Sequence, residues 1–212
     1  MRIAIFGASG ATGLLLTERC IAAGHGVTAL LRTPETFPYR DQVHVVPGNG
    51  FDPVAVGQTV EGADVVLSAL GARSLRKEEV LERAVPLIVA AMQKAGVKRI
   101  IALGSAGALS DSLKKQPAWR RWFVQNIVYN TFLKWPVASQ IAQWGMLSAS
   151  GLDWTMVMPS MLVNSPGRGV YRVDGDALPR HGMRISRSDV ADFMMLQIGN
   201  RQWVGKGAYI AW

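Results

Sequence analysis

Cysteine is almost missing from the sequence, since Cys20 is the single one among 212 residues. One thiol permits no internal disulfide and no cysteine-based metal cluster, so a disulfide-stapled domain is excluded. Charged residues make up only 18% of the chain, and no apolar run reaches the roughly 18 to 20 residues of a membrane-spanning helix. We therefore expect a protein of a reducing compartment, the cytoplasm.

Apolar residues are plentiful at 49%, which is enough for a sizeable core and excludes a disordered or collagen-like chain. A length of 212 residues predicts a single domain over residues 1–212. Basic residues outnumber acidic ones by 23 to 15, a net charge of +8. This balance favours an anionic partner, whether a nucleic acid, a membrane or a phosphate-bearing small molecule.

Short β-branched apolar runs alternate with glycine turns and helical patterns along most of the chain. Such alternation predicts βαβ units, and therefore an α/β fold with a central, mostly parallel sheet covered on both faces. The expected strands are Arg2–Phe6, Val27–Leu31, Val43–Val46, Val65–Leu70, Arg99–Leu103, Trp154–Met158 and Ala208–Ala211. The expected helices are Ala11–Ala23, Pro53–Thr59, Lys77–Ala95, a long segment from Pro117 to Ala149, and Val190–Ile198.

The pattern changes after Met158, where residues 159–179 are rich in glycine, proline and short polar side chains. Open α/β sheets bind ligands outside the carboxyl ends of their strands. We therefore expect the region of about 159–212 to form the small substrate side of a cleft at that edge, with Pro159 close to the cofactor.

A glycine-rich loop, Gly7-Ala8-Ser9-Gly10-Ala11-Thr12-Gly13, follows the first expected strand and opens the first expected helix. There the first glycine permits a tight turn, the second lets the backbone approach a pyrophosphate, and the third lets helix and strand pack closely. The helix amino terminus offers free N–H groups to the anion. We interpret the loop as a dinucleotide phosphate site rather than a turn without a ligand. No Gly-Lys-Ser/Thr follows, so a Walker loop is excluded.

Arg32 and Thr33 follow the second expected strand. An acidic residue at this point holds the ribose 2′-hydroxyl of NAD, whereas an arginine accommodates the 2′-phosphate of NADP. Arg32 therefore predicts NADPH, with Thr33 as a hydroxyl donor, and a solvated strand-end arginine is the alternative. Asn49 is expected near the adenine. The turn after the fourth strand adds Leu70, Gly71, Ala72 and Arg73, of which Arg73 is either a phosphate contact or a surface charge.

With these motifs the chain resembles the atypical short-chain dehydrogenase/reductases with NmrA-like NAD(P)-binding domains, and within them the biliverdin-IXβ reductase/flavin reductase family. The glycine loop is shared by the whole superfamily, whereas Ser150–Thr155 and Ile185–Ala191 narrow the likeness to this group. The likeness covers nearly the whole chain and is carried by Ile5–Gly13, Leu31–Arg32, Gly62–Val66, Leu70–Arg73, Gly104–Gly107, Ser150–Thr155, Val157–Pro159 and Ile185–Ala191.

The resemblance implies a three-layer Rossmann-like fold that binds NADPH. It further implies an oxidoreductase that passes hydride to a flavin such as FMN or FAD, a linear tetrapyrrole or a quinone, a small planar acceptor that we expect to be anionic. Ser105 is placed at the reaction centre. The alternative is an NADP(H)-binding regulator without turnover, as in NmrA-like proteins, and a sugar-nucleotide epimerase is disfavoured.

No general acid is assigned from the sequence. Conventional short-chain dehydrogenases use a Tyr-x-x-x-Lys pair, but Tyr129 and Lys134 are five residues apart and diverge by about 140° on a helix. Met161 stands where the biliverdin-reductase-like family has a histidine. His181, in the tail loop, is a minor candidate proton donor. No metal-ligand spacing joins the histidines, so no metal site is expected.

A basic, aromatic segment covers residues 114–135, with five cations against one acid between residues 111 and 139. Our interpretations, in decreasing order of preference, are a lid or core helix with solvated cations, an acceptor pocket, and a peripheral membrane contact through residues 117–135. A dimer contact is also open. A nucleic-acid surface ranks last because no nucleic-acid-binding module is present, and we expect no such partner. The oligomeric state is not predicted.

Overall fold

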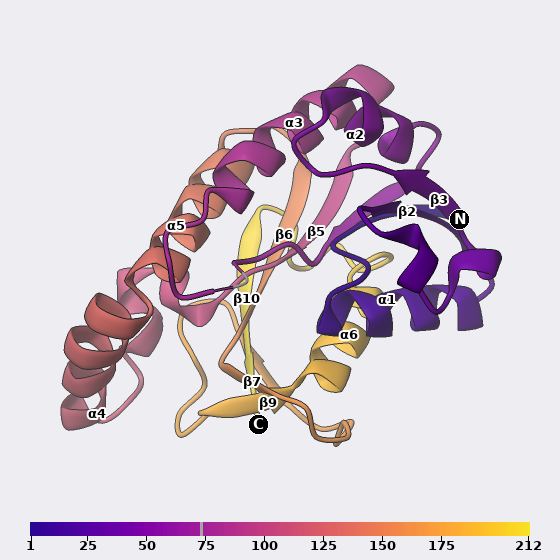
Figure 1. The fold of residues 1–212 in the computed structure, drawn as a ribbon. Helices are drawn as coiled ribbons and strands as arrows, with labels where there is room; N and C mark the ends of the chain where they lie inside the picture. Colours follow the sequence, from indigo (N-terminus) through magenta and orange to yellow (C-terminus); the bar gives the residue numbers. More distant parts are fainter. Residues whose placement is uncertain (73) are drawn as a thin grey trace.

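The computed structural model describes residues 1–72 and 74–212. Its strands are β1 (Arg2–Phe6), β2 (Gly26–Leu31), β3 (His44–Pro47), β4 (Val65–Ser68), β5 (Arg99–Leu103), β6 (Asp153–Pro159), β7 (Met161–Val163), β8 (Arg172–Asp174), β9 (Arg184–Ser186) and β10 (Lys206–Ala211). Eight of them form one sheet in the order β3-β2-β1-β4-β5-β6-β10-β8, and β7 pairs with β9 (Figure 1). The sheet is parallel except for the pairing of β10 with β8, which confirms the predicted fold class.

Helices cover both faces of the sheet. The α-helices of the described chain are α1 (Ala11–Ala22), α2 (Pro53–Val60), α3 (Val80–Ala95), α4 (Ala118–Phe123), α5 (Lys134–Ser148) and α6 (Arg187–Leu196). Helices α1 and α6 pack together on one face, and α2, α3 and α5 cover the other (Figure 1). Helix α4 projects away from the sheet beyond α5.

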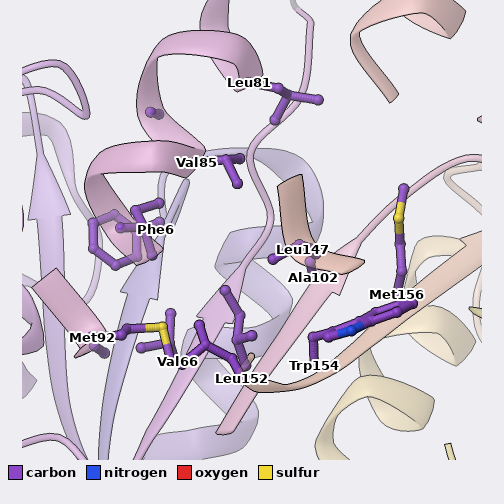
Figure 2. Close-up of a cluster of buried hydrophobic side chains, with 14 of the residues drawn as sticks. Phe6, Val66, Leu81, Val85, Met92, Ala102, Leu147, Leu152, Trp154 and Met156 are labelled. Carbon is purple, nitrogen blue, oxygen red and sulfur yellow. The ribbon is translucent and has the colours of Figure 1, made fainter. Parts of the chain in front are cut away.

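Alternate residues of the central strands enter two separate hydrophobic cores. In β1, Phe6 packs on the α3 side with Leu81 and Met92 (Figure 2), whereas Ile5 packs on the other side with Leu16 of α1. Because both faces are covered, the strands consist of nearly uninterrupted apolar residues instead of alternating ones.

Most expected elements are present, with boundaries moved by a few residues. The predicted ranges of β1 and β5 are correct, whereas α3 begins at Val80 rather than Lys77, and β10 begins at Lys206 rather than Ala208. Strands β7, β8 and β9 were not predicted. Each has three residues, which is too short for an alternating pattern to stand out in a segment rich in glycine and proline.

The long helical segment expected from Pro117 to Ala149 is divided into three pieces. Helix α4 is followed by a π-helix, η5 (Val124–Phe132), and α5 begins again at Lys134. Pro136 is the physical reason for a new start, because proline has no N–H to donate and is tolerated in the first turn of a helix. No described side chain of α4 or η5 is fully buried. Val124 and Tyr129 of η5 pack partly against the core, whereas the tryptophan and phenylalanine side chains are exposed, so this part is a surface segment rather than a core helix.

The amino ends of β5 and β6 are held together by a buried arginine. Arg99 is 7% exposed, and its guanidinium donates to the carbonyl of Asp153 and the hydroxyl of Thr155, both at 2.8 Å. It also donates to the carbonyl of Gln197, just after α6, at 2.7 Å. Burial, together with the nearby charge of Arg201, lowers the pKa of Arg99 to about 10, although Asp153 acts in the opposite direction. This end of the sheet lies opposite the carboxyl edge.

Candidate functional site

A cavity of about 590 Å³ opens at the carboxyl edge of the sheet, where β1 and β4 are neighbours. Strands β2 and β3 continue on one side of this point and β5 and β6 on the other, so the strand order reverses there. Doubly wound sheets bind ligands at such a point, and the volume suits a small molecule. Eleven of the predicted site residues line this cavity, namely Gly7, Ser9, Gly10, Ala11, Thr12, Arg32, Asn49, Leu70, Gly71, Ala72 and Ser105.

The turn from β1 into α1 leaves no room for side chains at two of its glycines. Gly7 has φ +79°, and a β-carbon there would lie 2.8 Å from the carbonyl carbon of Ala69. A β-carbon on Gly13 would lie 2.0 Å from the carbonyl oxygen of Gly7. Gly13 is therefore a packing position that brings the helix against the strand, and it lies outside the cavity lining.

The amino terminus of α1 faces the cavity without a side-chain cap. Gly10 is the N-cap residue, no side chain accepts from the first-turn amides, and the first turn contains no acidic residue. The backbone N–H groups at this end have no partner within the helix, and the helix dipole adds a partial positive charge. With Ser9, Ala11 and Thr12 also in the lining, this end of the cavity suits a phosphate or pyrophosphate.

Arg32 is the first residue after β2, and its exposed side chain lines the cavity. Among the described residues, no carboxylate forms an ion pair with it. Its guanidinium is therefore available to a bound anion. Thr33 lies outside the lining, and its carbonyl accepts a hydrogen bond from the Thr36 hydroxyl at 3.2 Å.

The turn after β3 forms the neighbouring wall. The side-chain oxygen of Asn49 accepts from the amide of Phe51 at 2.8 Å, so this oxygen is used within the turn. Phe51 also lines the cavity, and the guanidinium of Arg83 lies 4.1 Å from the centre of its ring. Sequence reasoning missed Phe51. An aromatic ring in the glycine-rich segment Gly48-Asn49-Gly50-Phe51 was a signal, but its exposure and its place in the lining are seen only in the structure.

The turn after β4 closes the cavity opposite the glycine loop. Leu70, Gly71 and Ala72 line it directly, and the preceding Ala69 contacts Gly7 through its carbonyl group. Arg73, the fourth residue predicted here, lies outside the described residues.

Ser105 marks the end of the cavity away from Arg32. It follows β5, and its hydroxyl oxygen accepts from the Gly107 amide at 3.3 Å. Helix α5 forms the facing wall through Leu133, Pro136, Val137 and Gln140. Gln143 holds this helix in place, because its amide donates to the Leu103 carbonyl at 3.0 Å and to the Gln140 side chain at 3.1 Å.

Tyr129 and Lys134 both lie outside the cavity lining. The ring of Tyr129 packs over Gly107, with a ring carbon 3.3 Å from where a β-carbon of that glycine would be. Burial raises the pKa of Tyr129 to about 12, so its phenol is a poor acid at neutral pH. Lys134 is exposed, and its ammonium lies 5.1 Å from the centre of the Trp135 ring.

Two further residues of the lining come from the C-terminal region, Leu162 of β7 and Arg187 at the start of α6. The guanidinium of Arg187 donates to the side-chain oxygen of Asn164. Sequence reasoning passed over Arg187 because it belonged to a family signature, Ile185–Ala191, with no role attached to its charge. Arg32, Glu78 and Arg187 are the ionisable residues that line the cavity in the described chain.

A buried carboxylate fixes the start of α6. Asp189 accepts from the backbone amides of Arg168 and Gly169, the hydroxyl of Ser186 and the indole N–H of Trp212, at 2.7 to 3.0 Å. Burial alone would raise the pKa of Asp189, but these hydrogen bonds outweigh it and hold the pKa below its ordinary value of 3.8.

Besides Gly13 and Thr33, two more residues assigned to the site from sequence lie outside the lining. Pro159 is buried at the end of β6, paired with Ile210, and is not part of the lining. His181 has φ +59° and lines a separate groove with Lys114, Lys115 and Arg180, so it is no proton donor for this cavity. Within the described residues, no cluster of histidine, cysteine, aspartate and glutamate could hold a metal. The described helices include none long and apolar enough to cross a membrane.

Comparison with known proteins gives one family match. A family model described as NAD(P)H-binding matches residues 7–201. A Burkholderia pseudomallei protein, provisionally described as exported, has 27% sequence identity and a TM-score of 0.81, with each chain covered over 100% of its length.

Two solved structures at 20% identity share the fold over the whole chain. ChuY, an anaerobilin reductase from Escherichia coli, has a TM-score of 0.82, with 100% of this chain and 97% of that chain covered. A short-chain dehydrogenase/reductase from Veillonella parvula, solved in complex with NADP, has a TM-score of 0.80, with 100% of this chain and 94% of that chain covered.

Gly13→Ala should lower the free energy of unfolding by about 3 kcal/mol, because the new methyl group must push α1 away from β1. The matched control is Gly145→Ala in α5, where a β-carbon meets nothing within 4 Å. This control should be stabilising by roughly 0.5 to 1 kcal/mol through helix propensity. Urea denaturation of the three proteins measures both effects, and equal midpoints for Gly13→Ala and the wild type would contradict the packing role.

Asp189→Asn should lower the free energy of unfolding by about 3 kcal/mol at pH 7, because a carboxylate with several donors becomes an amide. The folded-state pKa lies below the unfolded one, so this stabilisation is present above pH 3.8 and is lost as the pH falls toward the folded pKa. The difference from wild type should therefore shrink in urea denaturation at acid pH. Exposed Asp41→Asn is the control, and a difference independent of pH would count against the ionised carboxylate.

Proposed function

The chain belongs to the NAD(P)H-binding family, and from this premise we propose that it is an NADPH-dependent reductase of a flavin or a similar conjugated acceptor. One observation carries the proposal. A single cavity joins an uncapped helix amino terminus, the unpaired cation Arg32 and the hydroxyl-bearing Ser105. The reductase activity printed for ChuY and the NADP bound to the Veillonella structure support it.

The residues of one half of the cavity fit the phosphorylated half of NADPH. The uncapped amides at the start of α1 would hold the pyrophosphate, and the absence of a side chain at Gly10 leaves the backbone open to it. Arg32 would bind the 2′-phosphate, which a guanidinium matches with two parallel hydrogen bonds. Phe51 and Asn49 would border the adenine.

The other half of the cavity fits a planar anionic acceptor. Leu133, Val137 and Leu162 offer apolar surface for a conjugated ring, and Arg187 offers a cation for a carboxylate or phosphate on it. Tetrapyrroles and flavin mononucleotide both combine a flat ring with such an anion, whereas the charge of Arg187 is unused by a neutral quinone.

Positioning is the chemical contribution of the chain itself. A bound reduced nicotinamide supplies the hydride, and the surrounding side chains hold the two reactants together and exclude water. The Ser105 hydroxyl is placed to hydrogen-bond one of them. Among the described residues, the lining contains no tyrosine, lysine or histidine, and its one carboxyl group is that of Glu78. In this proposal the proton of the product comes from solvent.

The absence of a tyrosine, lysine or histidine from the described lining favours a second candidate function. A protein that binds NADP(H) without turnover needs the phosphate loop and Arg32 but needs neither Ser105 nor an acid. The two functions differ in whether NADPH is consumed when an acceptor is added.

We expect the wild type to oxidise NADPH when FMN is added, followed by the loss of reduced-nicotinamide absorbance. Ser105→Ala should lower kcat about tenfold, the effect of one lost hydrogen bond, and change the Kd of NADPH less than twofold. Ser148→Ala, on the exposed end of α5, is the control. Tight NADPH binding with no oxidation across flavins, tetrapyrroles and quinones would favour the regulator instead.

Arg32→Glu should raise the Kd of NADPH about a hundredfold, because a charge-assisted pair is replaced by repulsion. The Kd of NADH, which lacks the 2′-phosphate, should change little. Arg40→Glu makes the same charge change at an exposed position outside the cavity and serves as the control. Calorimetric titration of both nucleotides measures the effect, and an equal loss for the two would refute the 2′-phosphate assignment.

A further inference from the structure

A second surface of the molecule has a composition that the proposed function does not use. Residues 112–152 contain no aspartate or glutamate but five cations, namely Lys114, Lys115, Arg120, Arg121 and Lys134. Within this stretch, residues 118–135 comprise α4, η5 and the start of α5. We call these residues the aromatic arm, and α4 forms its projecting part in Figure 1.

The aromatic arm turns its large apolar side chains outward. Trp119 is 69% exposed, Trp122 62% and Phe132 59%, and Phe123, Ile127 and Trp135 are also exposed. Positions 119, 122, 123 and 127 are spaced three, one and four residues apart, which places them along one side of a helix. Scattered exposed apolar residues are ordinary on a protein surface, but a group of four tryptophan and phenylalanine side chains within α4 and η5 is not.

The inner side of the aromatic arm packs against the core. The exposed side chains of the outer side are therefore not needed to fix the position of this segment. Val124 and Tyr129 pack against the hydrophobic core on the α3 and α5 face. Tyr129 contacts Gly107. Trp122 and Phe132 therefore remain on the outside of a segment that is already fixed by its other face.

The cations of the aromatic arm have no carboxylate partner in the described part of the chain. Lys114 and Lys115, before the arm, form ion pairs with Asp174 and Asp176. Arg120, Arg121 and Lys134 form no ion pair among the described residues. Arg120 lies over the ring of Trp119 at 5.3 Å, an interaction that orients the guanidinium without neutralising it.

We propose that the aromatic arm docks the protein on the surface of a bilayer that contains anionic phospholipids. Tryptophan and phenylalanine enter the boundary between headgroups and acyl chains, where an amphipathic ring is stable. Arg120, Arg121 and Lys134 bind the lipid phosphates beside them. Residues 112–152 carry no carboxylate, and Asp174 and Asp176 pair only with Lys114 and Lys115 in the described chain, so Arg120, Arg121 and Lys134 complement the charge of the lipid phosphates.

A second copy of the chain is a poorer occupant of this surface. A symmetric contact through the aromatic arm would gather the cations of both copies in one interface, and residues 112–152 supply no carboxylate to offset them. A nucleic acid would satisfy the charge, but it would leave most of the apolar stripe exposed to water. A lipid surface satisfies both the charge and the apolar side chains.

Docking would also place the cavity near the lipid. Leu133 directly follows η5 and lines the cavity, as do Pro136 and Val137 in the first turn of α5. The base of the aromatic arm is thus one wall of the acceptor half. The docking itself does not depend on the proposed reductase activity, and its test uses no turnover.

The test is cosedimentation of the purified full chain with phosphatidylcholine vesicles, with and without phosphatidylglycerol, at low and high salt. We expect binding to the mixed vesicles that salt weakens, and little binding to phosphatidylcholine alone. Arg120→Gln with Arg121→Gln should weaken the partition about thirtyfold, and Trp119→Ser with Trp122→Ser at least about tenfold. All four positions are outside the core, so unfolding midpoints should stay unchanged.

Two control variants separate the aromatic arm from the general charge and apolarity of the surface. Lys94→Gln with Lys98→Gln removes the same charge at exposed positions, and Val54→Ser removes an exposed apolar side chain from α2; both should bind as wild type does. Absence of vesicle binding, equal binding to both lipid compositions, or equal loss in the controls would overturn the proposal. The proposal would also be overturned if the protein did not bind vesicles but formed a dimer that the tryptophan variants dissociate, or if it did not bind vesicles but bound nucleic acid.

Discussion

The contact between Gly13 and the carbonyl oxygen of Gly7 determines where the cavity forms. Because no β-carbon fits between them, α1 starts directly against the end of β1, and its first amides face the space beyond the sheet. Gly7 also lies close to the backbone of Ala69 after β4, since a β-carbon on Gly7 would be 2.8 Å from the Ala69 carbonyl group. The end of the cavity beside α1 is therefore built from backbone atoms, and the side chains of the lining are arranged around it.

The half of the cavity that we propose for the acceptor depends on Asp189, which lies outside its lining. Asp189 binds the 168–169 loop, the indole of Trp212 and the Ser186 hydroxyl, and these contacts set the direction in which α6 begins. Arg187 is in the same first turn, so its place in the lining follows from a buried carboxylate two residues away. The fold thus uses one buried charge, that of Asp189, to position a half-buried one, that of Arg187.

Local patterns were enough to predict the parallel strands of the sheet, the glycine turn and the position of Arg32 at the end of β2, because each depends on neighbouring residues. Phe51 and Arg187 could not be placed, since their roles arise only when distant turns meet at one edge of the sheet. The 114–135 segment shows the same limit. Its apolar residues match a buried helix as well as an exposed one, and only packing shows that Val124 is turned inward and Trp122 outward.

Arg99 makes the two edges of the sheet unequal in their tolerance of mutation. At the amino edge, one guanidinium joins β5, β6 and the end of α6, so a replacement there disturbs three segments together. At the carboxyl edge, the acceptor half is assembled from separate pieces, Leu133 to Gln140 and Leu162 among them. Under the proposed function, a new acceptor preference can therefore evolve by substitutions in these pieces, while the half of the cavity beside α1 and the amino edge stay unchanged.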